Sequence, residues 1–176
     1  MLRGDPLADP QPLIRRIYAY AAYRLGDGPE AEDVTSEVFE RAVRYRSSYD
    51  PRRGEPIAWL IGIARRCVAS SLDARPASPA LEPDSATASG DFEQEAVERL
   101  TLVAGVARLA ERDQELLALR FGADLSARRI GELLDMRSNA VDVAIHRALA
   151  RLRDELDHPE RAGDHGARLD PIKKTV

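Results

Sequence analysis

Arginine is the residue type in this chain whose chemistry indicates most directly what the protein binds. Of the 26 basic residues, 24 are Arg and 2 are Lys. The guanidinium group donates in a planar fork that matches phosphate oxygens and guanine edges, so an Arg-rich chain fits a nucleic-acid binder. A GC-rich coding sequence also produces an excess of Arg over Lys, and we consider this the main cause. The positions of the arginines therefore matter more than their number.

Neither catalysis nor metal binding is indicated by the side chains. The sequence has no glycine-rich phosphate loop and no HExxH motif, and its carboxylates fall on amphipathic helices as solvated partners of arginines. Cys67 is the lone cysteine, and His146, His158 and His165 have no cysteine clusters beside them. We expect no enzyme activity, no catalytic residues, no cofactor, no metal and no small-molecule substrate.

The elements that must position these arginines are predicted to be helices. Of the 176 residues, 44% are hydrophobic, 32% are charged and only 5% are aromatic, a balance typical of a soluble, mostly helical protein. No apolar run has the length of a membrane span and no signal peptide is evident, so we expect a cytoplasmic protein without direct membrane insertion. The expected fold class is all-α, with two small helical domains joined by a flexible linker, the C-terminal one a helix-turn-helix.

Charge is distributed unevenly along the chain. The net charge is −4, but residues 10–75 carry +2, residues 76–98 carry −6 and residues 99–156 carry +1. The acidic stretch overlaps "RPASPALEPDSATASGD", which is rich in Pro, Ala and Ser and has no apolar period. We therefore predict a first domain over 10–75, an acidic flexible linker over 76–92, a second domain over 93–156 and a disordered tail over 157–176.

Three helices are predicted in the first domain from apolar residues at steps of three and four. They cover 13–25, 31–45 and 57–72, and a turn-rich loop over 46–56 places Pro56 in the first turn of the third helix. The predicted inward residues of the third helix are Leu60, Ile63, Ala64, Cys67 and Val68.

A helix-turn-helix is predicted in the second domain. Helical runs over 93–109 and 110–121 precede it. Ser126 can cap a short helix, "DMRS" makes a tight turn, and Ser138 or Asn139 can cap a longer helix that reaches residue 156. The residues spaced as a mutually packed core are Ile130, Leu133, Leu134, Met136, Val141, Ile145, Ala148, Leu149 and Leu152.

Two motifs resemble one known family, the extracytoplasmic-function (ECF) group of bacterial RNA polymerase sigma factors. "AEDVTSEVFERA" (31–42) followed by "WLIGIARR" (59–66) resembles the family's region 2, and "IGELLDMRSNAVDVAIHRALARLR" (130–153) resembles its region 4. Generic helix-turn-helix regulators share the second motif. Both motifs in this order, on either side of an acidic linker, are much more specific.

The resemblance implies a division of labour. Region 2 would dock on the β′ clamp helices of core RNA polymerase and read and melt the minus ten element, while region 4 would meet the β flap and read the minus thirty-five element. An anti-sigma factor is a further candidate partner. The candidate polymerase-binding residues are Asp33, Glu37, Glu40, Arg41 and Arg44, which form a mixed-charge face on the second helix. A solvated helix face is the alternative, which composition alone favours.

The loop over 46–56 matches the place where this family captures an unstacked promoter base. Tyr49 could stack on that base while Arg52 and Arg53 contact phosphates, although an ordinary surface turn fits the same residues. Trp59 is expected in the core instead. The remaining candidate DNA-binding residues are Arg65, Arg66, Arg128, Arg129, Arg137, Ser138, Asn139, Asp142, His146, Arg147 and Arg151.

Departures from the family pattern leave rival functions open. Where the family commonly has a basic run in the recognition helix, this chain has Asp142, Val143 and Ala144, so minus thirty-five binding is expected to be weak or unusual. Arg66 stands where the family usually has Asn. One alternative is a degenerate sigma-like module that binds proteins but does not read DNA. The other, an ordinary helix-turn-helix regulator with a helical sensor domain, is disfavoured by the region 2 motifs.

Overall fold

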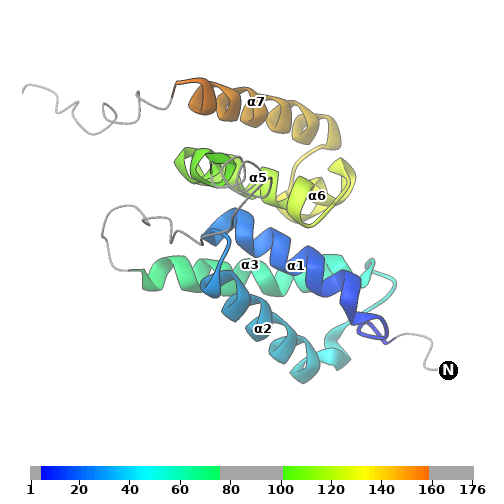
Figure 1. Ribbon diagram of the computed structural model, residues 1–176. Helices are drawn as coiled ribbons and strands as arrows, with labels where there is room; N and C mark the ends of the chain where they lie inside the picture. The colour runs from blue at the N-terminus through cyan, green and yellow to red at the C-terminus, as the bar shows by residue number, and fades with distance from the viewer. Residues whose placement is uncertain (1–4, 76–100, 159–176) are drawn as a thin grey trace, which may run out of the picture.

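The fold of the chain is all-α, as predicted. A computed structural model describes residues 5–75 and 101–158, and these ranges contain helices and turns but no strand. Figure 1 shows the helices in layers. From top to bottom, α7 lies above α5 and α6, these lie above α1 and α3, and α2 is the lowest helix. The predicted linker, and the tail beyond His158, fall outside the described residues.

The first domain consists of three helices: α1 (Pro10–Leu25), α2 (Pro29–Arg44) and α3 (Pro56–Ala74). Each begins with a proline, which lacks a backbone N–H and is set near the helical φ angle, so it suits a first turn. Pro56 is one of them, as predicted. Between α2 and α3, a short 3₁₀ helix, η1 (Arg46–Ser48), opens the predicted loop.

The side chain of Arg75 links the three helices of the first domain. Arg75, just after α3, donates to the carboxylate of Glu30 on α2 and to the carbonyl of Leu25 on α1 (2.8 Å). The hydrogen bonds from Arg75 hold the pKa of Glu30 below its usual value, with a smaller contribution from the hydroxyl of Ser71. One side chain therefore ties together the ends of all three helices.

The second domain is helical over residues 101–108 and continues with α5 (Glu111–Leu117), η2 (Ala118–Gly122), α6 (Ala127–Leu134) and α7 (Ser138–Asp157). η2 is a π-helical turn, closed by the hydrogen bond from Ala123 N to Ala118 O (2.9 Å). The Ser126 hydroxyl accepts from the backbone of Arg129 and caps α6, as predicted. The predicted cap of α7 is wrong: Ser138 is its first residue, and Arg137 precedes it without a side-chain cap.

A tight turn joins α6 to α7 and completes the helix-turn-helix. Asp135 adopts the left-handed conformation (φ 54°) that ends α6, and Met136 N donates to Gly131 O (2.9 Å). A Cβ added at Gly131 would lie 2.4 Å from the Met136 carbonyl oxygen. Only glycine therefore lets the backbone of the turn approach α6 so closely.

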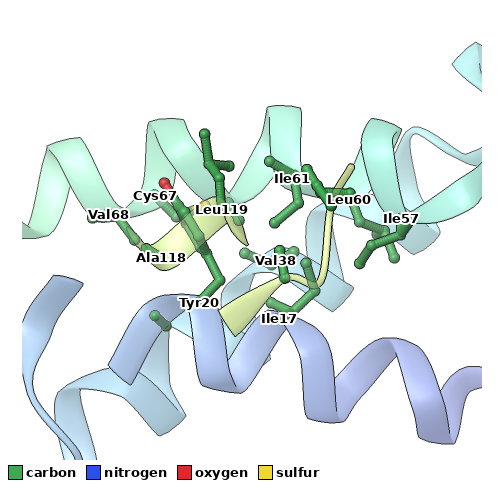
Figure 2. Packing of buried hydrophobic residues seen from close by; sticks show 14 of the residues in the cluster. Ile17, Tyr20, Val38, Ile57, Leu60, Ile61, Cys67, Val68, Ala118 and Leu119 are labelled. Atoms are coloured by element: carbon green, nitrogen blue, oxygen red, sulfur yellow. The ribbon is translucent and has the colours of Figure 1, made fainter. Parts of the chain in front are cut away.

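One buried cluster spans both domains, an arrangement the sequence did not predict. It joins Ile17 and Tyr20 of α1 and Val68 of α3 to Ala118 and Leu119 of η2, and each of these residues is at most 1% exposed. Figure 2 shows Leu119 and Ala118 among the side chains of α1 and α3. Ile130, Val141 and Ile145, which were expected to pack on one another in the helix-turn-helix, belong to the same cluster.

Leu149 corrects the predicted core of the second domain. Its side chain is 39% exposed, whereas Val141, Ile145, Ala148 and Leu152 on the same helix are buried. α7 packs on α5 and α6 along one face only, so residues outside that face remain in solvent. In the third helix Ile63 is likewise only partly buried, while Ile57 and Ile61 are buried.

Across residues 5–75 and 101–158, none of the helices combines the length with the apolar character needed to cross a bilayer.

Candidate functional site

The mixed-charge face on α2 lies on the side of the helix away from its neighbours. α2 packs on α1 and α3 through Ala31, Val34, Val38 and Ala42. The five candidate polymerase-binding residues occupy the other positions: Asp33, Glu40 and Arg44 are exposed, and Glu37 and Arg41 are partly buried and form an ion pair. The exposed side of the helix thus carries both signs of charge, although Glu37 and Arg41 also pair with each other beside Cys67 of α3.

The loop before α3 is held by its own aromatic side chain. Tyr49 is partly buried, its ring centroid lies 5.6 Å from that of Trp59 with the planes inclined by 56°, and its hydroxyl donates to Gly54 O (3.0 Å). Arg52 and Arg53 are exposed at the tip. Trp59 also packs on the buried cluster. The structure therefore shows Tyr49 bracing the loop, with the side chains of Arg52 and Arg53 exposed at its tip.

Two candidate DNA-binding arginines are engaged across the boundary between the domains. Arg65 donates from Nε to the Glu115 carboxylate (2.8 Å) and from Nη1 to Leu133 O (3.3 Å). Arg129 donates from Nη1 to Arg53 O (3.4 Å) and pairs with Glu132 on its own helix. Their neighbours Arg66 and Arg128 are exposed.

The first half of α7 presents an exposed and largely polar surface. Arg137, Ser138, Asn139, Asp142, His146 and Arg147 are all exposed. Farther along, Arg151 is exposed at its head but pairs with the buried carboxylate of Asp113 on α5 (2.6 Å). Asp142 has an exposed neighbour in Val143, whereas Ala144 is half-buried against the core. The first half of α7 therefore has an exposed, largely polar face, and Asp142 lies in the middle of that face.

A charged cluster between α1, α3 and α5 was missed by the sequence analysis. Glu115 of α5 accepts from Tyr20 OH (3.0 and 3.2 Å) and from Arg65, and its Oε2 lies 3.3 Å from Arg24 Nε. Arg24 also donates to the carbonyl (2.9 Å) and carboxylate (3.1 Å) of Glu111. Burial, together with the charge of Glu115, raises the pKa of Tyr20.

A signal for this cluster was present in the sequence. Tyr20 and Arg24 lie one helical turn apart, on the apolar stripe of the first helix. A charged residue on an apolar stripe must find a buried partner, because an unpaired buried charge is costly. The Arg24 side chain is only 5% exposed. The partners, however, are about 90 residues away in the sequence, where no local pattern identifies them.

Comparison with known proteins identifies both domains. Residues 11–75 match the family model for sigma-70 region 2, and residues 99–152 match the model for sigma-70, region 4. These ranges contain the two motifs described above in the same order.

Several curated proteins are similar over most of the chain. It is 34% identical to the ECF RNA polymerase sigma factor ShbA of Streptomyces griseus, over 85% of this chain and 84% of that protein. It is 32% identical to SigD of Mycobacterium tuberculosis, over 85% of this chain and 74% of SigD. With BldN of Streptomyces coelicolor it shares 28% identity over 77% of this chain, but the match covers only 54% of BldN.

A solved structure has the same fold. The sigma factor RpoE from Bartonella quintana, in a crystal with the anti-sigma factor NepR, superposes with a TM-score of 0.61, covering 84% of this chain and 93% of RpoE at 18% identity. Together with the two matched regions and the identity to ShbA and SigD, these findings show that the chain belongs to the family of ECF RNA polymerase sigma factors.

Proposed function

We propose that the chain binds core RNA polymerase in the cytoplasm and directs it to promoters, where it opens the DNA. The observation that carries the proposal is the presence of both sigma regions in order on one chain. The chain needs no catalytic residues of its own for this role, because the polymerase supplies the chemistry. Partners are therefore the polymerase and promoter DNA, with an anti-sigma factor as a possible regulator.

The work is divided between the two regions. The charged face of α2 docks on the β′ clamp helices. The loop over 46–56 and the arginines of α3 handle the minus ten element as it melts. α7 reads the minus thirty-five element, with region 4 seated on the β flap. Exposure of the charged side chains on α2, at the loop tip and on the first half of α7 supports this division.

A second candidate function rests on Asp142. A carboxylate in a major groove is repelled by phosphates and can accept only from the amino groups of cytosine and adenine among the base edges. The exposure of Asp142 near the start of α7 is the observation behind this candidate, a sigma-like protein that binds polymerase or a regulator without reading a minus thirty-five element, although the two family matches favour the first function. The two functions share the docking face and differ in the need for DNA.

Charge reversal on the docking face tests the shared part. The double variant Glu37→Arg and Glu40→Arg is expected to bind core polymerase about five- to tenfold more weakly, because electrostatic complementarity steers and orients docking. Glu37 and Glu40 are exposed or half-exposed, so the change in the free energy of unfolding should be under about 1 kcal/mol. Titration of labelled core polymerase with each protein measures the affinity.

A matched control separates position from net charge. Asp73→Arg with Asp154→Arg makes the same change in charge at exposed sites on α3 and α7. It should bind polymerase like the parent. Equal affinities for all three proteins would remove the docking role from α2.

A further inference from the structure

One large apolar side chain lies on the exposed face of α7. Val143 is 50% exposed and packs on neither buried cluster. It lies two residues from Val141 and two from Ile145, both of which are buried, and two residues correspond to about 200° around an α-helix. Val143 therefore projects away from the core of its domain, on the part of α7 that the proposed function directs to the minus thirty-five element.

Asn139 lies one turn before Val143 on the same side of the helix. Its side chain is exposed and does not cap α7 or bond to another residue in the described part of the chain. Four residues advance about 6 Å along an α-helix, which is less than two base-pair steps of about 3.4 Å. From a helix in the major groove, both side chains can therefore reach one base pair or two adjacent ones.

The stability of the helix does not explain either residue. The β-branched Val and the polar Asn are both poorer helix formers than Ala, Leu, Arg or Glu. At these positions Val143 gains nothing from the buried clusters, and the Asn139 side chain does not cap the helix. A partner that contacts both side chains would account for them.

The major-groove edge of an A·T pair has the complementary chemistry. Thymine presents a C5 methyl group that an apolar side chain can contact, and adenine presents an N7 acceptor beside an N6 amino donor that an amide can pair with twice. In a helix-turn-helix, the N-terminal residues of the second helix contact base edges. Asn139 and Val143 are the second and sixth residues of α7, so both lie in this part of the helix.

Basic side chains on either side of the pair can hold the helix on the duplex. Arg137 and Arg147 are exposed, and neither forms an ion pair with another residue that the structure describes. Phosphate contacts of this kind position a protein but carry no sequence information. Selection of a base therefore falls to the side chains between the two arginines, among which Val143 is the only exposed large hydrophobic one.

We propose that Asn139 and Val143 make minus thirty-five recognition selective for A·T pairs, with Val143 against a thymine methyl group and Asn139 paired with an adenine. The Asn139 amide nitrogen donates to adenine N7, and its carbonyl oxygen accepts from the N6 amino group. The inference rests on the proposed function and adds to it the base that α7 selects. This readout needs no positive charge, so it is compatible with Asp142 in place of a basic run.

Modified bases test these contacts atom by atom. In a promoter fragment that gives a transcript with the full-length chain and core polymerase, the segment around minus thirty-five is randomised, and the fragments that the holoenzyme binds are sequenced. In the preferred sequence each thymine is replaced in turn by deoxyuridine, which lacks the C5 methyl group, and each adenine by 7-deazaadenine, which lacks N7. One deoxyuridine should weaken binding about threefold, the effect of one buried methyl group. One 7-deazaadenine should weaken it about fivefold.

Variants assign each effect to one side chain. With Val143→Ala the deoxyuridine effect should disappear while the 7-deazaadenine effect remains, and with Asn139→Ala the reverse should hold, as in a double-mutant cycle. Val143→Ile keeps an apolar contact and should keep both effects. The matched control is Leu102→Ala, which truncates an exposed apolar side chain on the helix that packs at Leu156, near the other end of α7. It should bind like the parent, and circular dichroism confirms that each protein keeps its helices.

Three results would overturn the inference. Parent binding that is indifferent to every deoxyuridine would remove the thymine contact. An unchanged base preference in both alanine variants would assign the selection to other residues. Weaker binding of Val143→Ala to core polymerase itself, with the same base preference, would make Val143 an anchor for a protein. Failure of the proposed function looks different, because the parent would then give no transcript from any fragment, and this inference would fall with it.

Discussion

Alanine at Tyr49, Arg52 and Arg53 together is expected to reduce promoter opening by about 5- to 150-fold, the range that corresponds to the 1–3 kcal/mol of one base stacked on an aromatic ring. Arg52 and Arg53 are exposed at the loop tip, where they can follow a separated strand. Tyr49 presents its ring beside Trp59 and ties the loop through Gly54 O. The triple variant lacks both exposed arginines and the tyrosine that holds the loop in shape. Permanganate reactivity of unpaired thymines in the holoenzyme complex measures the bubble.

A single variant, Tyr49→Phe, separates the contribution of the Tyr49 ring to promoter opening from that of its hydroxyl group. Tyr49→Phe removes the hydroxyl bond to Gly54 O but keeps the ring, so it should retain most of the opening activity if stacking dominates. Duplex binding by region 4 should be unchanged in every variant of the loop. A triple variant that opens the promoter as well as the parent would make the loop an ordinary surface turn.

Lysine in place of Asp142 is expected to strengthen binding of a minus thirty-five duplex by about tenfold at low salt, with a log–log salt slope steeper by about 0.9 for each additional phosphate that the protein neutralises. The position is exposed on the first half of α7, so the free energy of unfolding should change by less than about 0.5 kcal/mol. Fluorescence anisotropy at several salt concentrations gives both quantities. Adding arginine at position 144 as well is not suitable, since Ala144 is half-buried against the core.

The control for this variant lies on the same helix. Asp154→Lys makes the same charge change about 18 Å farther along α7, at 1.5 Å per residue. Only the change at Asp142 should alter the salt slope if the N-terminal half of α7 enters the groove. Identical curves for the two variants would mean that this part of the helix does not meet DNA, and the function without DNA reading would be favoured.

Local features of the fold were predictable because the sequence encodes them locally. Pro56 at the start of α3, the Ser126 cap and the turn that begins at Asp135 follow from short-range chemistry at single positions. The helices of the first domain were predictable because each buries one face, and a buried face requires apolar residues at intervals of three and four. The cap of α7 was misplaced by one residue because Ser138 and Asn139 both suit a helix start, and neither side chain caps it in the structure.

The packing between the domains could not be predicted from local pattern. η2 is a π turn, and its wider hydrogen-bond ring directs Leu119 and Gly122 toward α1. A search for apolar residues at intervals of three and four treats residues 110–121 as one regular helix, so it misses this change of direction. Ion pairs such as Arg24 with Glu111 join residues far apart in sequence, so only the tertiary structure reveals them.

The roles of the candidate site residues stay predictions, and the structure bears only on their exposure and their contacts. Exposure of the charged residues on α2 and on the first half of α7 agrees with the surfaces that were expected. Arg65 and Arg129, by contrast, proved to have intramolecular partners. Composition and spacing identify a polar side chain, but they do not show whether another part of the chain already satisfies it.

Run-off transcription with purified core polymerase tests the central claim most directly. Fragments of genomic DNA that carry promoters serve as templates, and the full-length chain is added to core polymerase. We predict transcripts from defined start sites that are absent with core polymerase alone and are reduced by the Glu37→Arg and Glu40→Arg double variant. Stable binding to core polymerase without any new transcript would contradict the claim and would identify the chain as an interaction module that does not initiate transcription.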